Sequence, residues 1–246
     1  MATGERAGEV NAATFVEVGD RAVLVGFGDV PDDATLGAVL ALDRALLDDP
    51  PAGLDEVVPG QINLLVVFDP LATDHRRVSD HVRGLIDVGG ATLPPGKSCE
   101  IEVCYDDDLA PDLDEIATRT GLSAAAVIDA HLAGELRVLM YGFAPGYAYL
   151  GGLADSIRLP RKEAAVRDVP AGTAIIAGHQ ALITTLDMPT GWWRVGRSPT
   201  LLLPHDLNDP FPLEPADRVR FVRIDRDTYE QRRRAPQPPV VLEGLS

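Results

Sequence analysis

The feature that most limits how this chain can fold is the glycine-rich segment at 141–153. It reads Tyr-Gly-Phe-Ala-Pro-Gly-Tyr-Ala-Tyr-Leu-Gly-Gly-Leu. Glycines at this density indicate a backbone that turns sharply or closely approaches another group. Pro145 fixes its own φ angle and favours an extended conformation at Ala144. We therefore expect a rigid, sharply turning stretch of chain here.

Aromatic side chains accompany this rigid backbone at Phe143, Tyr147 and Tyr149. Such a combination is typical of the wall of a small-molecule pocket. The alternative is a plain turn whose rings fill a hydrophobic core, because aromatic residues dominate cores in general. The composition of the segment leaves both interpretations open, and the sequence that follows it favours the pocket.

Four ordered motifs follow the glycine-rich segment. They are Arg158-Leu-Pro-Arg-Lys162, Val169-Pro-Ala-Gly-Thr-Ala-Ile-Ile-Ala-Gly-His-Gln180, Pro189-Thr-Gly-Trp-Trp-Arg-Val-Gly-Arg-Ser-Pro199 and Ala216-Asp-Arg-Val-Arg-Phe221. Together with the glycine-rich segment they resemble the KipI-like family. That family includes the B subunit of bacterial ATP-dependent 5-oxoprolinase, allophanate hydrolase subunit 1 and a carboxyltransferase subdomain of urea carboxylase. Earlier stretches also fit its pattern, so the resemblance covers most of residues 14–225.

The resemblance implies an α+β fold, in which a small N-terminal α/β sandwich is followed by a cyclophilin-like β-barrel. We accordingly expect an N-terminal domain at 10–93 and a barrel domain with a helical insertion at 97–225. Residues 226–246 are predicted to be a tail that is frayed or lies against a partner. The Pro/Gly-rich stretch 92–97 marks the boundary between the domains.

The chain departs from the family pattern directly after Gln180. The family has Thr-Gly-Ile-Tyr-Pro there, and this chain has Ala181-Leu-Ile-Thr-Thr185. Ala181 lacks the hydroxyl of a threonine, and Leu182 adopts a positive φ angle less readily than a glycine. The phenol of the family's tyrosine is also missing. We therefore expect an intact fold whose pocket is retuned towards a less polar ligand.

Composition indicates a soluble, cytoplasmic protein. The chain has 38 acidic and 22 basic residues and a net charge of −16, which argues against partners such as nucleic acid or an anionic membrane surface. Neither a secretory signal nor an apolar run of membrane-spanning length is expected from its sequence. Cys99 and Cys104 are predicted to point to opposite faces of one strand, so they cannot bridge each other.

The spacing of apolar residues predicts the local structure. Strands are expected at 14–18 and 21–27 with a two-residue turn between them, then a helix at 33–47, a strand at 62–68, a helix through 78–86 and a strand at 100–105. A capping-box-like sequence at 112–115 predicts a helix that ends at Gly121, and Ser123 is expected to cap the next helix. From Leu136 onwards, short strands separated by glycine and proline are typical of a compact barrel.

No recognisable motif for a metal or for nucleotide phosphates occurs in the sequence. The histidines form no His-x-His or His-x-x-x-His pair, and the acidic run 106–108 is interpreted as a solvated loop. Neither Gly-x-x-x-x-Gly-Lys-Ser/Thr nor Gly-x-Gly-x-x-Gly is present. The resemblance implies that the assembly uses ATP, without indicating how this chain would hold it.

Four polar residues within the family motifs are candidates for the site. We predict that His179, at a strand end, carries protons near neutral pH, with a plain loop histidine as the alternative. Gln180 offers one acceptor and two donors to an amide or a carboxylate. The guanidinium groups of Arg161 and Arg197 suit a carboxylate or phosphate, with a structural salt bridge as the alternative.

Two adjacent tryptophans, Trp192 and Trp193, lie on a predicted strand, so we expect one ring to face inwards and the other outwards. The outward ring would serve as an interface anchor or as a pocket wall. His131 lies on a predicted helix beside Val127 and Ile128, and we interpret it as a structural histidine.

The resemblance implies a subunit of an ATP-dependent 5-oxoprolinase-like or allophanate-hydrolase-like amidohydrolase. It would act on a cyclic or small amide together with a companion homologous to allophanate hydrolase subunit 2. In this hypothesis Gln180, Arg161 and Arg197 bind the substrate, and the aromatic residues shape the pocket. Two alternatives stay open. One is a kinase-inhibitor-like module that binds a protein, and the other is a stand-alone paralogue that binds an apolar small molecule in the barrel pocket.

Overall fold

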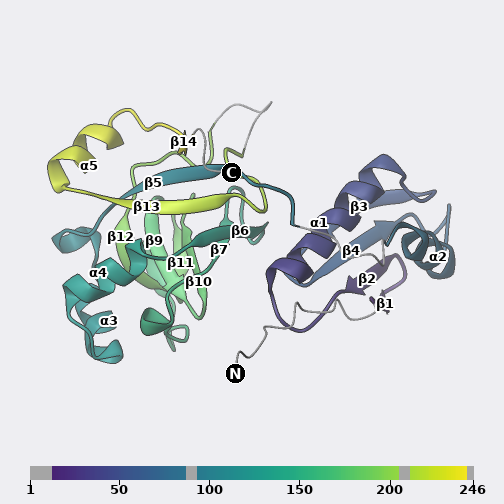
Figure 1. Cartoon of the computed structure of the whole chain (residues 1–246), viewed down its shortest axis with the longest axis horizontal. Coiled ribbons are helices and arrows are strands. Elements are labelled where there is room, and N and C mark those ends of the chain that lie inside the picture. Colours follow the sequence, from purple (N-terminus) through teal and green to yellow (C-terminus); the bar gives the residue numbers. More distant parts are fainter. Residues whose placement is uncertain (1–12, 87–92, 205–210, 243–246) are drawn as a thin grey trace, which may run out of the picture. The chain divides into compact units, whose positions relative to one another are not determined.

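A computed structural model describes residues 13–86, 93–204 and 211–242 of the chain. The chain divides into two units, Met1–Pro94 and Pro95–Ser246. This division falls within the Pro/Gly-rich stretch that the sequence marks as a boundary. In Figure 1 the first unit is drawn in purple and blue, and the second runs from teal to yellow.

The first unit is an antiparallel sheet covered on one face by two helices (Figure 1). Its elements are β1 Thr14–Val18, β2 Ala22–Gly26, α1 Asp33–Asp48, β3 Leu54–Pro59, β4 Asn63–Phe68 and α2 His75–Leu85, and the strand order is β1-β2-β4-β3. Alternate residues of β4, namely Leu64, Val66 and Phe68, pack against buried residues of both helices. This is the small α/β sandwich that the resemblance implies.

Two predictions for this unit are wrong in detail. The connection between β1 and β2 is one residue longer than expected, because Val18 pairs with Ala22 and residues 19–21 form the turn. The apolar pattern also gives no sign of strand β3. This strand lies at the edge of the sheet, and most of its side chains are exposed or half-exposed, so it carries no apolar run.

The second unit is built around a closed β-barrel. Its elements are β5 Ser98–Cys104, η1 Asp107–Leu109, α3 Leu113–Thr120, α4 Ala124–Leu132, β6 Leu136–Tyr141, β7 Ala148–Gly151, η2 Asp155–Ile157, β8 Val166–Val169, β9 Thr173–Ala177, β10 Gln180–Ile183, β11 Met188–Thr190, β12 Trp193–Arg197, β13 Arg218–Ile224, α5 Arg226–Arg233 and β14 Val240–Leu242. The strand order is β12-β9-β10-β7-β6-β13-β5, and pairing of β12 with β5 closes the barrel. Strands β8 and β11 form a separate two-stranded ribbon.

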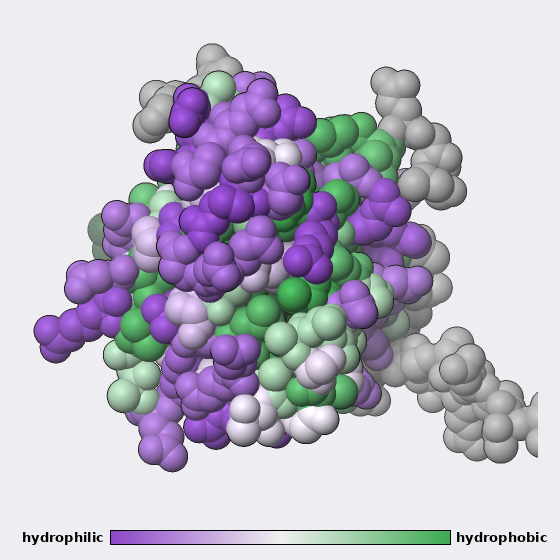
Figure 2. Space-filling model, turned by 90° about the vertical axis from the view of Figure 1, so that its left-hand side faces the viewer, coloured by the Kyte–Doolittle hydropathy of each residue, from purple (hydrophilic) through white to green (hydrophobic). Residues whose placement is uncertain are grey.

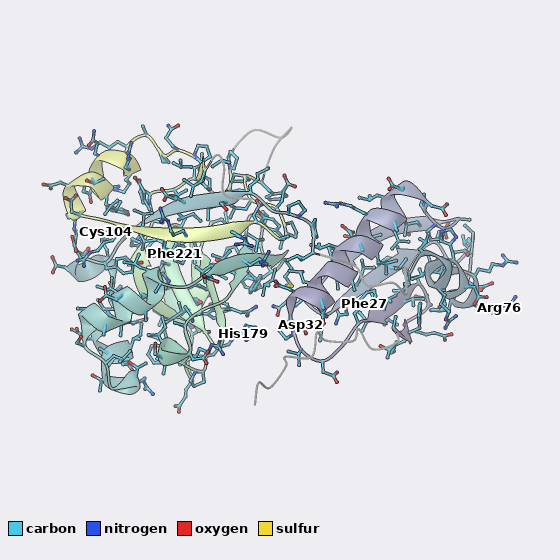
Figure 3. The ribbon with its side chains drawn as sticks, viewed as in Figure 1. Phe27, Asp32, Arg76, Cys104, His179 and Phe221 are labelled. Atoms are coloured by element: carbon cyan, nitrogen blue, oxygen red, sulfur yellow. The ribbon has the colours of Figure 1, made fainter. Side chains whose placement is uncertain are left out.

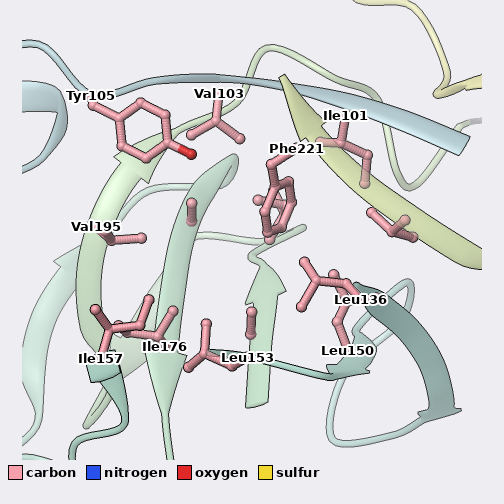
Figure 4. Packing of buried hydrophobic residues seen from close by; sticks show 14 of the residues in the cluster. Ile101, Val103, Tyr105, Leu136, Leu150, Leu153, Ile157, Ile176, Val195 and Phe221 are labelled. Carbon is pink, nitrogen blue, oxygen red and sulfur yellow. The ribbon is translucent and has the colours of Figure 1, made fainter. Parts of the chain in front are cut away.

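Alternate side chains of the barrel strands fill its interior. Figure 4 shows Ile101, Leu150, Ile176, Val195 and Phe221 among the residues that meet in this core. Helices α3 and α4 add further apolar residues to the same core. Their other sides face solvent, and Figure 2 shows many hydrophilic side chains on the face that carries α3, α4 and α5.

The ends of α3 and α4 follow the sequence signals in part. Gly121 ends α3 with a φ angle of 72°, and the Ser123 hydroxyl accepts a hydrogen bond from the Ala126 amide at 3.1 Å. The predicted capping box at the start of α3 is wrong. Asp112 occupies the N-cap position, but its carboxylate makes no cap bond and turns towards Arg194 instead.

The C-terminal residues 226–242 are part of the barrel unit, so the prediction of a frayed or partner-bound tail is wrong for them. Tyr229 of α5 packs against Cys104 and Leu109, and β14 pairs with β5. Cys99 faces the barrel core while Cys104 faces α5, which confirms that the two free thiols point to opposite faces. Within the described ranges no helix has the length and hydropathy needed to cross a membrane.

Candidate functional site

The glycine-rich segment joins β6 to β7 and forms one wall of a hollow, which we call the aromatic hollow. It lies on the face of β7, β9 and β10 that points away from the barrel core, and its volume is about 110 Å³. Its lining consists of Phe143, Tyr147, Tyr149, Arg161, Ile175, Leu182, Pro189, Thr190, Gly191 and Trp192. The structure therefore brings together several side chains that the sequence singled out separately.

Close backbone approaches shape the glycine-rich segment, as its composition predicts. Gly146 has a φ angle of 74°, and a Cβ atom there would lie 3.0 Å from Thr185 and 3.1 Å from the Leu202 carbonyl oxygen. The Thr185 hydroxyl also donates a hydrogen bond of 2.6 Å to the carbonyl oxygen of Pro145. At Gly152, with a φ angle of 96°, a Cβ atom would come within 2.3 Å of the Glu135 carbonyl oxygen. These contacts fix the wall of the hollow.

The three aromatic residues of the segment occupy different depths of the hollow. Tyr147 is buried, whereas Phe143 is 76% exposed at the rim, and their ring centroids lie 5.7 Å apart. Phe143 has a φ angle of 70°, a left-handed conformation that is costly for a residue with a side chain. The Tyr149 ring meets the Trp192 ring at 5.9 Å. Together these rings form a flat-sided slot.

The two tyrosines keep their phenol protons at neutral pH. Burial raises the pKa of Tyr147 to about 12, and it also raises the pKa of Tyr149 above its usual value. Each phenol can therefore donate a hydrogen bond to an oxygen of a bound molecule.

Arg161 supplies the positive charge of the aromatic hollow. Its guanidinium lies over the Trp192 ring, 5.6 Å from the centroid, and in the part of the chain that the structure describes it has no ion pair. The neighbouring backbone is held on both sides: Trp193 Nε1 donates 2.7 Å to the Pro160 carbonyl, and the Lys162 amide donates 2.7 Å to the Gly191 carbonyl. Arg161 is thus held at the hollow with its charge free for a ligand.

A buried ion cluster anchors this backbone to helix α3. Asp112 is 4% exposed, accepts hydrogen bonds from Arg194 Nε at 3.0 Å and Nη2 at 2.7 Å, and forms an ion pair with Lys162 Nζ at 2.8 Å. Burial alone would raise the pKa of Asp112, but the bonds from Arg194 and Lys162 outweigh it and hold the pKa below its usual value. No sequence pattern points to this cluster. Its members are far apart in sequence, and Asp112 resembles an ordinary helix cap.

Gln180 lies beside the aromatic hollow rather than in its lining. It pairs with Ala177 and with Gly151, and it shares a face of β10 with Leu182, which does line the hollow. Gln180 Nε2 is buried without a hydrogen-bond partner. Gln180 and Tyr147 therefore belong to the same face of the barrel wall, and an unused amide donor is available there.

His179 sits in the tight turn between β9 and β10, next to Gly178 with its φ angle of 56° (Figure 3). Its side chain is exposed, and it is not among the residues that line the aromatic hollow. The rim position at a strand end agrees with expectation. The structure of this chain does not bring the imidazole to the hollow.

Arg197 is separated from the aromatic hollow, contrary to its expected place beside the other substrate-binding residues. Its Nη2 donates a hydrogen bond of 3.1 Å to the Ala171 carbonyl oxygen, and the side chain lines a different hollow beyond the end of β12. The reason is the strand geometry, because Arg197 ends β12 and Trp192 precedes it, so the two lie at opposite ends of the strand.

The two tryptophans face opposite sides of the chain, as alternation predicts, but neither ring is exposed. Trp192 is 5% exposed and packs in the aromatic hollow, whereas Trp193 is 3% exposed and packs in the barrel core. Lys162 and Arg119 cover the Trp193 ring, at 4.6 and 4.9 Å from its centroid. The expected exposed interface anchor is therefore wrong for the chain by itself, and Trp192 serves as a pocket wall.

The stretch that departs from the family pattern forms part of the hollow. Ala181 is fully buried in the barrel core, and Leu182 places its side chain in the hollow wall beside Ile175. A glycine at position 182 would leave that space open. The departure therefore makes the hollow smaller and more apolar, in the direction that the sequence predicts.

His131 belongs to the barrel core and not to the hollow. Its Nδ1 lies 2.8 Å from the Tyr105 hydroxyl, and its ring stacks on Phe221 at 4.5 Å. Burial lowers the pKa of His131 to about 3, so the imidazole is neutral at physiological pH. This agrees with a structural role. Among the described residues no three His, Cys, Asp or Glu side chains gather as metal ligands.

Known proteins similar to this chain share a common theme in their names. The 5-oxoprolinase B subunit of Bacillus subtilis is 33% identical over 227 residues, which cover 87% of this chain and 93% of that protein. The 5-oxoprolinase B subunit of Escherichia coli O157:H7 is 31% identical over 208 residues, which cover 83% and 93% respectively.

Solved structures extend this similarity to the fold. The TTHA0988 structure is 36% identical with a TM-score of 0.72 over 83% of this chain, which spans 40% of the longer TTHA0988 chain. The Kluyveromyces lactis urea carboxylase has a TM-score of 0.78 at 16% identity over 98% of this chain and 26% of that chain, a likeness of fold alone. Residues 13–213 match the family described as carboxyltransferase domain, subdomain C and D. This chain therefore belongs to the carboxyltransferase C and D subdomain family.

Proposed function

We propose that this chain is the substrate-binding subunit of an ATP-dependent 5-oxoprolinase-like amidohydrolase that works in the cytoplasm. The observation that carries the proposal is Arg161, an arginine without an ion pair in the described part of the chain, set at a slot of aromatic rings. An unpaired guanidinium recognises a carboxylate, and aromatic walls suit a small flat ring. The names of relatives at 30–33% identity support the same interpretation.

The size of the aromatic hollow supports a small substrate. Its volume of about 110 Å³ is below the range of roughly 300–1,000 Å³ that is usual for drug-sized ligands. A five-membered lactam with one carboxylate suits such a space. In this proposal Arg161 binds the carboxylate, while the Tyr149 phenol and the Gln180 amide donate hydrogen bonds to the lactam oxygen. Donors aimed at that oxygen stabilise the negative charge that develops when the C–N bond is attacked.

The proposed reaction needs a companion subunit, homologous to allophanate hydrolase subunit 2, and this companion would take part in the ATP-dependent step. TTHA0988 supports joint action, because a similar unit there is part of a chain more than twice as long. His179 stays a prediction as the proton carrier. Its exposed position would require the companion to complete the site around it.

The test is reconstitution of the pair. The chain is purified with and without the product of an adjacent companion gene, and ATP-dependent conversion of 5-oxoproline to glutamate is measured. We expect activity only in the mixture, and we expect Arg161→Gln to abolish it or to raise KM at least tenfold. Arg76→Gln, which removes an exposed arginine of the first unit, is the matched control. A silent pair, or an Arg161→Gln variant as active as the parent, rejects the proposal.

One observation favours a second candidate, a stand-alone protein that binds an apolar small molecule. Leu182 and Ile175 together present an apolar wall at the base of the hollow. Native mass spectrometry of the purified chain distinguishes the two functions. A retained apolar ligand supports the second candidate, and its absence together with active reconstitution supports the first.

A further inference from the structure

A second hollow lies beyond the end of β12, on the side where helix α5 covers the barrel. Its volume is about 200 Å³. Its wall includes Arg197, Ser198 and Thr200 from the chain after β12, Thr185 after β10, and Tyr229 and Arg233 from α5. We call it the hydroxyl hollow. It shares no lining residue with the aromatic hollow.

Arg197 is the least satisfied polar group in this hollow. Nη2 is bonded to the Ala171 carbonyl oxygen, but the Nε atom is buried without a hydrogen-bond partner. In the described ranges no carboxylate forms an ion pair with Arg197. A buried donor left unpaired costs about 1–3 kcal/mol, so an oxygen atom placed against Nε would recover a substantial free energy.

Hydroxyl groups surround this guanidinium. The Ser198 hydroxyl oxygen accepts a hydrogen bond from the Thr200 amide at 3.1 Å, which leaves its O–H free to donate. The Thr200 hydroxyl lines the same wall. The close fit depends on Gly172, where a Cβ atom would lie 2.6 Å from the Ser198 carbonyl oxygen. The hollow thus offers donors from several directions.

The charge of the lining is positive. Arg233 adds a second guanidinium, which Glu230 of the same helix engages at 2.7 Å, and none of the lining residues is acidic. The carboxylate of Asp108 interacts with the charge of Arg197, but it is itself paired with Arg226. A net positive hollow with several donors is suited to a small multivalent anion.

We propose that the hydroxyl hollow is a binding site for a phosphate group. A tetrahedral oxyanion can accept hydrogen bonds from Arg197 Nε and from the Ser198 and Thr200 hydroxyls at once, whereas a carboxylate has two oxygens in one plane. A volume of about 200 Å³ holds a phosphate but not a whole nucleotide. The bound group is therefore inorganic phosphate or the phosphate of a small metabolite. The site is independent of the aromatic hollow and of the function proposed for it.

The test measures binding of inorganic phosphate to the whole chain by titration calorimetry at constant ionic strength, with acetate and ATP as parallel ligands. We expect saturable phosphate binding, at least tenfold weaker acetate binding, and a loss of at least tenfold in Arg197→Gln. Arg161→Gln, which alters the aromatic hollow, should bind phosphate like the parent. Glycerol phosphate serves as the organic arm and distinguishes a free from an esterified phosphate.

Three results overturn the proposal: no saturable phosphate binding, equal binding in Arg197→Gln, or acetate bound as tightly as phosphate. Should Arg197→Gln fail to fold by circular dichroism, Thr200→Val decides, because it removes one half-buried hydroxyl without changing charge. A threefold or greater loss in Thr200→Val supports the site, and unchanged binding rejects it. Failure of 5-oxoproline turnover leaves these results untouched, since Arg161→Gln reports on that function separately.

Discussion

The aromatic and the hydroxyl hollows each contain one arginine with no ion pair in the described part of the chain, yet they surround it differently. Arg161 lies over an indole ring in a slot of aromatic side chains, and the segment that carries it is anchored by Asp112. Arg197 is bonded to a backbone carbonyl and faces hydroxyl groups. The same guanidinium is therefore prepared for a flat organic acid in one place and for a tetrahedral anion in the other. The surroundings, not the charge, set the ligand.

The largest expected effect comes from breaking the anchor of the aromatic hollow alone. Asp112→Asn leaves Lys162 and Arg194 buried without their carboxylate, and breaking a buried ion cluster of this kind costs about 3–5 kcal/mol. Urea denaturation should show this loss of unfolding free energy. Asp155→Asn, which breaks an exposed pair with Arg158, is the control and should change it little.

If Asp112→Asn stays folded, it should impair 5-oxoproline binding and leave phosphate binding unchanged. Equal losses at both hollows would show that the comparison between them is false.

Acid should remove both hollows together, through the barrel core that they share. Burial lowers the pKa of His131 to about 3 in the folded chain, against about 6.5 when unfolded, so the unfolded chain binds the proton first. The stabilisation is complete above pH 6.5 and is lost as the pH falls towards 3. At pH 4.5 the loss is about 2.7 kcal/mol.

Urea denaturation at pH 7 and pH 4.5 measures this loss. A His131→Phe variant that also carries Tyr105→Phe removes the imidazole and its hydroxyl partner together, and it should lose less stability over the same interval. The same acid sensitivity in that variant would assign the loss to other groups.

A conservative exchange sharpens the contrast between the two arginines. Arg161→Lys keeps the charge but loses the planar fork and its stacking on Trp192, so KM for 5-oxoproline should rise about tenfold, or about 1.4 kcal/mol. Arg197→Lys should leave that KM unchanged. Steady-state kinetics of the reconstituted pair provide the measurement, and a similar KM change in both variants would contradict the assignment.

The smallest expected effect concerns the apolar wall. Leu182→Val removes about one methylene from the aromatic hollow and should cost about 1 kcal/mol of stability. It should also admit a methyl-substituted 5-oxoproline better than the parent does. Ile183→Val, on the opposite face of β10, is matched in size and should cost similar stability with no change in substrate preference. Equal substrate effects in both variants would place the specificity elsewhere.

The sequence predicts the fold better than it predicts the site. Ordered motifs and helix signals such as Gly121 and Ser123 act locally, so they identify the sandwich, the barrel and the helix ends. The α5–β14 segment escapes prediction because its apolar contacts come from distant residues such as Cys104. Only tertiary structure reveals such partners.

The site illustrates the same limit. The aromatic residues and Arg161 belong to motifs that are near one another along the chain, and they meet in the hollow as expected. Arg197 belongs to the same run of motifs as Trp192, but the length of β12 carries it to another hollow. Asp112 looks like a helix cap until Lys162 and Arg194 are placed against it. Spacing alone cannot distinguish these outcomes.

Strand β5 pairs in parallel with β13, so Ser98 lies opposite Arg218 and Cys104 opposite Ile224. During synthesis the first strand of the barrel must wait for nearly the whole remaining chain to leave the ribosome before its main hydrogen-bonding neighbour exists. The sandwich has all its strands within the first 68 residues and can form much earlier. The nascent barrel unit therefore spends the longer time with open sheet edges, and it is where a chaperone has most to protect.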